Sequence, residues 1–92
     1  MRFIYPAVIS ERTDGTYHAS FPDLMMCEAD GETLFEVQRN ATQAAFDWID
    51  LEMHEEDPDL PPASDKSEIV LKEGERVCDI LVIYRMHEGW DE

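Results

Sequence analysis

Residues 33–54 read TLFEVQRNATQAAFDWIDLEMH, and this stretch decides the fold class. Thr33 and Glu36 have the spacing of a capping box, in which two side chains satisfy backbone N–H groups left unpaired at a helix start. An apolar stripe then recurs every three or four residues, at Leu34, Val37, Ala41, Ala44, Trp48 and Leu51. The pattern predicts one long helix over residues 34–54, with this stripe facing a sheet.

A second apolar stripe lies roughly 90–120° around the same predicted helix. It consists of Phe35, Phe46, Ile49 and Met53. The helix therefore carries more apolar width than one sheet contact uses. Two explanations stay open: the loop after the helix folds back over this stripe, or the stripe is a dimer or partner surface.

Strands are expected before the helix. A hairpin is predicted over residues 2–21, because apolar residues alternate on both sides of the turn signal Thr13-Asp14-Gly15. Pro6 has no N–H to donate, so the first strand is expected at a sheet edge or with that position turned away from its neighbour. Residues 21–24, FPDL, break the alternation, and residues 25–29 are expected to form a short third strand.

An acidic, proline-rich linker is predicted over residues 55–67, followed by a C-terminal strand region over 68–86 with an extra short strand at 68–72. Ile80 to Tyr84 are five consecutive apolar residues, which favours a strand covered on both faces. Residues 1–92 are therefore expected to form a single α+β domain of order β-β-β-α-β. Its sheet is antiparallel-rich, with one long helix packed on one face.

Charge narrows the class of partner. The 92 residues hold 7 Lys or Arg against 22 Asp or Glu, a formal charge of −15. Direct nucleic-acid binding is not expected, because phosphates need a basic face, and a basic protein is the natural complement. Between Arg39 and Lys66 there is no cation, and the carboxylates there are Asp47, Asp50, Glu52, Glu55, Glu56, Asp57, Asp59 and Asp65.

Location follows from what the sequence lacks. No apolar run approaches the ~20 residues that span a bilayer, and the N-terminus does not read as a secretory signal. Cys27 and Cys78 stand alone, without the C-x-x-C spacing of a zinc or redox motif, and are expected to be free thiols. These features favour a cytoplasmic protein without membrane contact.

An ordered series of short motifs resembles the HicB family of toxin–antitoxin antitoxins over about residues 3 to 65. The series is Tyr5-Pro6-Ala7-Val8, Gly15, Phe21-Pro22-Asp23-Leu24, Cys27, Gly31-Glu32-Thr33, Glu36, Asn40-Ala41, Ala44 and Leu60-Pro61-Pro62. The resemblance implies a truncated ribonuclease H-like domain that binds and neutralises a small basic HicA-type, mRNA-cleaving toxin. This chain has Met25-Met26 where the family commonly has Pro-Gly, and no C-terminal DNA-binding domain is expected, because six residues follow Met86.

Catalysis is not expected from this chain. A nuclease of the ribonuclease H type needs carboxylates converging on two metals, with one acid in the first strand, and residues 3–9 contain none. His18, His54 and His87 fall in different elements, so no catalytic, metal or cofactor site is predicted.

Two groups of residues are candidates for partner binding. The first is the loop Phe21, Pro22 and Asp23, which has a plain structural alternative: Pro22 fixes a turn, Asp23 accepts backbone N–H groups, and Phe21 fills the core. The second is the end of the predicted helix and the start of the linker, namely Phe46, Asp47, Asp50, Met53, Glu55 and Glu56. This acidic run also has a plain alternative, a solvated face that keeps the protein in solution.

The resulting hypothesis is an antitoxin that occludes the active face of its toxin and also forms a homodimer through a strand edge. The main alternative is an orphan, non-enzymatic binding or dimerisation domain that lacks a toxin and regulates another basic protein. A nucleic-acid mimic is a third, weaker alternative.

Overall fold

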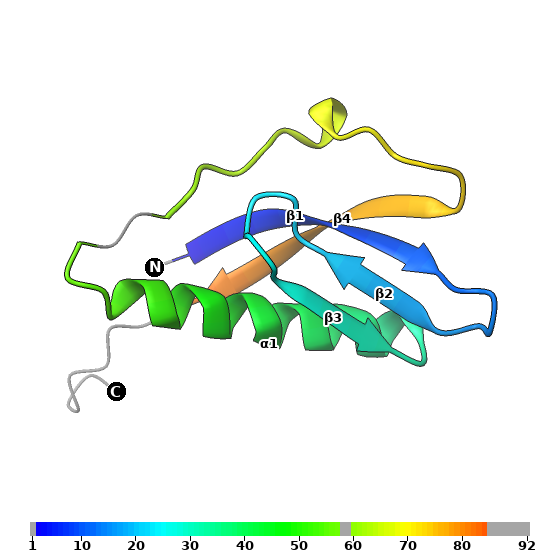
Figure 1. The fold of residues 1–92 in the computed structure, drawn as a ribbon, viewed down its shortest axis with the longest axis horizontal. Coiled ribbons are helices and arrows are strands. Elements are labelled where there is room, and N and C mark those ends of the chain that lie inside the picture. The colour runs from blue at the N-terminus through cyan, green and yellow to red at the C-terminus, as the bar shows by residue number, and fades with distance from the viewer. Residues whose placement is uncertain (1, 58–59, 85–92) are drawn as a thin grey trace.

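The computed structural model describes residues 2–57 and 60–84. Within them it contains four strands, one α-helix and one 3₁₀ turn (Figure 1). In chain order these are β1 (Arg2–Glu11), β2 (Tyr17–Ser20), β3 (Glu28–Gly31), α1 (Leu34–Met53), η1 (Lys66–Glu68) and β4 (Glu75–Ile83). The predicted α+β class and the order β-β-β-α-β are confirmed.

The strands form one antiparallel sheet of order β3-β2-β1-β4. The prediction of an edge position for the first strand is wrong, because β1 lies between β2 and β4. Its pairing with β4 runs from Arg2 opposite Ile83 to Ser10 opposite Glu75, whereas β2 pairs with it only from Val8 onward. Pro6 therefore lies where β1 has a single neighbouring strand, which lowers the cost of its missing N–H.

The helix begins at the predicted capping box. The Glu36 N–H donates to the Thr33 hydroxyl at 3.0 Å, and the Glu36 carboxylate accepts from the Glu32 N–H at 2.7 Å, one residue earlier than in the standard motif. A Cβ on Gly31 would collide with the backbone of Val37, so only glycine allows β3 to pass directly into the helix. The helix ends at Met53, with His54 as its cap.

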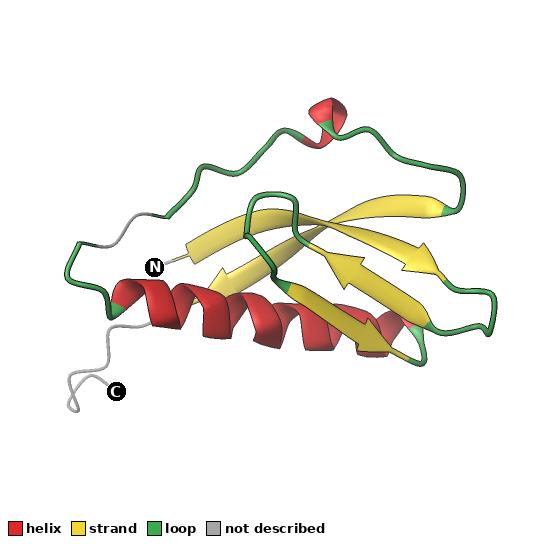
Figure 2. Cartoon of the chain, viewed as in Figure 1, coloured by secondary structure: helices red, strands yellow, loops and turns green. Residues whose placement is uncertain are grey.

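One face of the sheet packs against α1 (Figure 2). The helix residues buried there are Val37, Ala41, Ala45 and Ile49. The predicted stripe is wrong at its far end, since Leu51 is 71% exposed. A line of residues four apart winds slowly around a helix of 3.6 residues per turn, and such a line follows a twisted sheet better than an alternation of three and four.

The second predicted stripe is divided. Ile49 belongs to the core, Phe46 and Met53 are partly buried, and Phe35 is 72% exposed. The end of β4 covers Phe46, whose ring centroid lies 5.6 Å from that of Tyr84. From residue 60 onward the linker runs along the side of the sheet that holds β1 and β4 (Figure 1), where the Tyr5 hydroxyl donates to the Pro61 carbonyl at 2.6 Å, and not over this stripe.

The sequence predicted a last strand that is covered on both faces, and this prediction is wrong. The side chains of β4 alternate between a buried and an exposed face. Ile80, Val82 and Tyr84 are buried, but Leu81 is 45% exposed and Ile83 52%. The physical reason is that the sheet has a helix on one face only. On the outer face, Leu81 lies opposite Ile4, itself 53% exposed, and we call Ile4, Leu81 and Ile83 the β4 strip.

Two predicted strand positions are also wrong. The third strand starts at Glu28, not at residue 25, because hydrogen bonds between Phe21, Leu24 and Cys27 close residues 21–27 into a tight loop. Residues 68–72 form no strand; the 3₁₀ turn η1 stands at Lys66–Glu68, capped by the Asp65 carboxylate. The predicted last strand reached residue 86, but β4 ends at Ile83, and residues 85–86 lie outside the described residues.

Candidate partner-binding surface

The loop of residues 21–27 carries the first group of predicted site residues. The Phe21 N–H donates to the Cys27 carbonyl at 3.1 Å, and the Cys27 N–H donates to the Leu24 carbonyl at 3.1 Å. Phe21, Leu24 and Cys27 are 4%, 0% and 5% exposed, so they hold the loop on the core. Phe21 therefore shapes the loop from beneath, whereas Pro22 is exposed on it.

Asp23 joins this loop to the linker. Its carboxylate accepts the Ser64 N–H at 2.8 Å and the Ser64 hydroxyl at 2.6 Å. The partner of Asp23 is thus 41 residues away in sequence, not a backbone group of its own turn. The side chain is half-buried and accepts two hydrogen bonds, so it acts as a clasp that holds the loop and the linker together.

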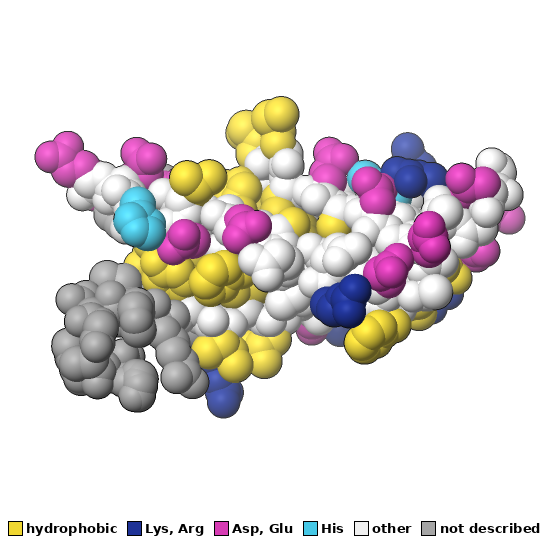
Figure 3. Space-filling view, turned by 90° about the horizontal axis from the view of Figure 1, so that it is seen from below, with side chains coloured by type: hydrophobic (Ala, Val, Ile, Leu, Met, Phe, Trp, Pro, Cys, Tyr) yellow, Lys and Arg dark blue, Asp and Glu magenta, His cyan; other side chains and the backbone are white. Residues whose placement is uncertain are grey.

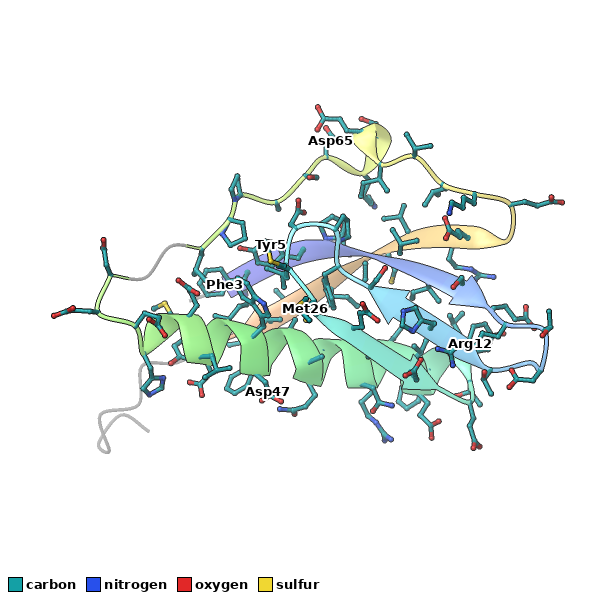
Figure 4. The ribbon with its side chains drawn as sticks, in the orientation of Figure 1. Phe3, Tyr5, Arg12, Met26, Asp47 and Asp65 are labelled. Carbon is teal, nitrogen blue, oxygen red and sulfur yellow. The ribbon has the colours of Figure 1, made fainter. Side chains whose placement is uncertain are left out.

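The second group lies on the C-terminal half of α1 and just beyond it. Asp47 is exposed, accepts from the Gln43 amide at 3.0 Å, and projects from the helix (Figure 4). Asp50 is half-buried and accepts the Tyr84 hydroxyl at 2.9 Å, which raises the pKa of Tyr84 through that hydrogen bond. Glu55 and Glu56 are exposed after the helix end, whereas Phe46 and Met53 are partly buried.

The structure brings the loop and the helix together. The Trp48 indole N–H donates to the Met25 carbonyl at 3.0 Å, which fastens the loop to α1. Burial raises the pKa of the Cys27 thiol to about 11, with further contributions from the negative charges of Asp47 and Glu28. The loop thus stands within reach of carboxylates from both the helix and β3.

Sequence reasoning missed two residues at the tip of this loop. Met25 is 78% exposed and Met26 89%, and we call this pair the methionine knob. Met26 has a φ of 62°, the left-handed region, and is the one non-glycine residue with positive φ in the described part of the chain. Both fall within the third strand predicted over residues 25–29; the predicted turn at residues 21–24 ends three residues too early, because the loop continues to Cys27.

The space-filling view shows the character of this face. Seen from the helix side, hydrophobic atoms project at one edge of the outline, and carboxylates lie along one side of an apolar patch (Figure 3). Lys and Arg are sparse there, in line with their absence between Arg39 and Lys66. The arrangement can contact another macromolecule through apolar groups and attract positive charge around them.

A network of polar side chains occupies the other end of the sheet. His18 lies 2.8 Å from a carboxylate oxygen of Asp30 and 3.3 Å from one of Glu28, and Arg12 also pairs with Asp30. The hydrogen bond from His18, followed by Arg12, lowers the pKa of Asp30. These exposed pairs join β1, β2 and β3 on the outer face, where surface ion pairs contribute little to stability.

Residues 2–57 and 60–84 do not form a site for metal or small-molecule chemistry. No group of three or more His, Cys, Asp or Glu there could hold a metal ion. A shallow depression of about 390 Å³ lies along the first half of α1, lined by Phe35, Gln38, Arg39, Thr42 and Gln43. It contains no carboxylate, thiol or imidazole. Across the same described ranges, no helix has the length and apolar character to cross a membrane.

The fold and the surface define a class: a small α+β domain, with a helix on one sheet face, whose surface exposes apolar side chains and carboxylates. A sequence model described as "HicB_like antitoxin of bacterial toxin-antitoxin system" matches residues 5–83. The chain belongs to this family of HicB-like antitoxins, whose role is regulatory.

Solved structures support the fold. A toxin–antitoxin complex from Streptococcus pneumoniae is similar with a TM-score of 0.75 at 23% identity, covering 90% of this chain and 70% of that one. The N-terminal domain of the Burkholderia pseudomallei antitoxin HicB gives 0.75 at 18%, covering 91% and 100%. A HicA3 and HicB3 toxin–antitoxin complex gives 0.66 at 29%, covering 88% and 96%. No curated protein matches the chain.

Proposed function

We propose that this chain binds and neutralises a small, basic, HicA-type toxin that cleaves mRNA, by covering the toxin's active face. The observation that carries the proposal is the conjunction of exposed apolar groups and carboxylates, at residues 25–26 and on the second half of α1. Family membership supports it, as does the likeness to chains solved in toxin–antitoxin complexes.

Neutralisation requires no chemistry from the antitoxin. A ribonuclease works by contacting RNA through a basic face, so an acidic surface of matching shape excludes the substrate. The central strand β1 carries no carboxylate between Phe3 and Ile9, where a nuclease of this architecture would need one. We place the complex in the cytoplasm, where mRNA is available and where Cys27 and Cys78 remain free thiols.

Association is expected to be fast and sensitive to salt, because a charge of −15 steers a basic protein toward this surface over a Debye length of about 8 Å at physiological ionic strength. Buried apolar contacts then set the lifetime of the complex. If 300 mM of added salt left the association rate constant unchanged, as measured by stopped flow, electrostatic steering would be excluded.

The test of function is a tagged pull-down from the native host, at low and then high salt, with mass spectrometry of the co-eluting proteins. The expected result is a small basic protein near one-to-one whose cleavage of mRNA stops when this chain is added. A neighbouring reading frame that encodes a short, lysine-rich protein would identify it independently. Recovery of this chain alone would contradict the proposal and favour an orphan domain.

We also propose that two copies associate through β4, which lies at the end of the described sheet. The β4 strip leaves three apolar side chains exposed there. Two cations lie beside it: Arg2 is opposite Ile83, and Lys66 pairs at 3.3 Å with Asp79, two residues along β4 from Leu81. Two acidic chains repel each other least at such a charge-balanced edge. Sedimentation equilibrium measures the association directly.

A further inference from the structure

We propose that the methionine knob is the apolar anchor that this antitoxin inserts into a cation-rimmed pocket of its toxin, and that Met26 is kept in a strained conformation in order to present it. This inference rests on the proposed function, because it names the part of the surface that the toxin grips. It goes further by separating the residue that makes contact from the residues that build the loop.

Met26 combines two properties that do not serve the fold. Its φ of 62° is a conformation that side chains with a Cβ adopt only with strain, and glycine adopts freely. Its side chain is 89% exposed, so packing within the chain does not compensate for that strain. Strain of this kind persists where the surrounding structure imposes it, and it gathers at ligand-contact sites. The methionine therefore has a use outside the folded domain.

The loop beneath the knob is rigid, which suits an anchor. Leu24 and Cys27 are buried under it, the Met25 carbonyl is fixed by the Trp48 indole at 3.0 Å, and Asp23 is fixed by two bonds to Ser64. A pre-ordered loop loses little conformational entropy on binding. Methionine itself is unbranched and polarizable, so it fills pockets of irregular shape.

Charge selects the occupant. Asp47 and Glu28 lie close enough to the loop to act on the Cys27 thiol, and Asp47 projects from α1 below Met26 (Figure 4). A second copy of this chain would bring its own charge of −15 against these carboxylates. A pocket with apolar walls and lysine or arginine at its rim complements both features of the knob.

The decisive variant is Met26→Gly in the full chain, because strain and contact predict effects of opposite sign. Removing the side chain relieves the left-handed strain, and the midpoint of thermal unfolding should rise by about 2–5 °C. The same change removes the anchor, so the dissociation constant for the purified HicA-type toxin of the neighbouring reading frame should rise about tenfold. Calorimetry gives both quantities.

Three further variants keep the test specific. Met26→Leu retains an apolar side chain and should bind within about threefold of the wild type, whereas Met26→Asn, which tolerates positive φ, should bind as weakly as the glycine variant. Val70→Ser removes an apolar side chain that is 91% exposed on the segment between η1 and β4, and it should leave binding unchanged.

The failures are distinguishable. If the wild type does not bind the toxin, the proposed function is wrong, and this inference with it. If the wild type binds and Met26→Gly binds equally well, the anchor is wrong while the function stands. A fall in the unfolding temperature of Met26→Gly would contradict the claim that the backbone at Met26 is strained.

Discussion

The methionine knob and the β4 strip both expose apolar side chains, yet the charges beside them differ. Carboxylates of Asp47 and Glu28 lie close to the loop that carries the knob, whereas Arg2 lies opposite Ile83 and Lys66 pairs with Asp79 beside the strip. Apolar contact has no direction of its own, so the neighbouring charges decide which partner approaches. The two interfaces that we propose, one for a basic protein and one for a second copy of the chain, would thereby attract different partners.

The backbone beneath the two regions differs as well. The strip spans two regular, paired strands: Leu81 and Ile83 lie in β4, whose nine residues pair with β1, and Ile4 lies in β1. Simple alternation along each strand puts these side chains on the outer face. The knob stands on an irregular loop fixed by side chains from α1 and the linker. A substitution in the strip therefore acts on one surface, whereas a substitution in the loop can act on both the surface and its support.

The largest effect is expected from a double variant of the β4 strip, Leu81→Lys with Ile83→Lys. Two charges buried in an apolar contact between copies should raise the dimer dissociation constant at least about a hundredfold, with toxin binding unchanged. Sedimentation velocity over a concentration series measures this. Val70→Lys, which adds a charge off the strip, is the control, and a dimer that survives the double variant would rule out this edge.

The next largest effect, on toxin association instead of self-association, is expected from the double variant Asp47→Lys with Glu55→Lys. Reversing two exposed charges, one on α1 near the loop of the knob and one just beyond the end of α1, should slow toxin association about tenfold at low salt and have little effect on self-association. Stopped-flow kinetics give the rate constant. Glu11→Lys with Glu73→Lys makes the same change of net charge away from the knob; equal slowing in both variants would mean that net charge acts, not this face.

A smaller effect separates residues that contact the toxin from residues that hold the loop in place. Asp23→Ala removes the acceptor of two bonds from Ser64, and the free energy of unfolding should fall by about 1–3 kcal/mol. Urea denaturation measures it. Ser64→Ala should cost less, because Asp23 can still turn to water. If Asp23→Ala were as stable as the wild type and bound toxin poorly, Asp23 would be a contact residue instead of a clasp.

The smallest effect concerns pH. The folded pKa of Cys27 is raised from 9.0 to about 11, so the unfolded chain ionises first as pH rises. Stability is complete at neutral pH and falls between about pH 9 and 11, by about 1 kcal/mol at pH 10. Urea denaturation at pH 8 and 10 tests this against Cys27→Ala, which should lose that part of the pH dependence. The Asp47→Asn variant should show a smaller fall.

The fold could be predicted because its determinants are local. Alternation marks the hairpin, and the Thr33 and Glu36 pair marks the helix start, whichever way the rest of the chain packs. Pro6 did not reveal that β1 lies in the middle of the sheet. A proline is tolerated there because β2 pairs with β1 only from Val8 onward, and the sequence around Pro6 does not show where that pairing stops. Likewise, the run from Ile80 to Tyr84 does not reveal that one face lacks a cover.

The candidate surface was predicted only in part. The acidic helix end is legible in the sequence, because charge is written there directly. The roles within the loop are not, since Asp23 finds its partner 41 residues away and Met26 owes its exposure to the closing of residues 21–27. Long-range bonds and backbone angles belong to the folded chain, and no spacing rule contains them.

The pairing of β1 with β4 has a consequence for synthesis. The central strand is complete at Glu11, but its longest partner begins at Glu75. At about 5–20 residues per second, a ribosome needs roughly 3–13 s to supply it. Throughout that interval one edge of β1 has no partner, and a message cut before the codon for Glu75 yields a chain that lacks β4. The cell thus obtains this protein whole or in a form exposed to proteolysis.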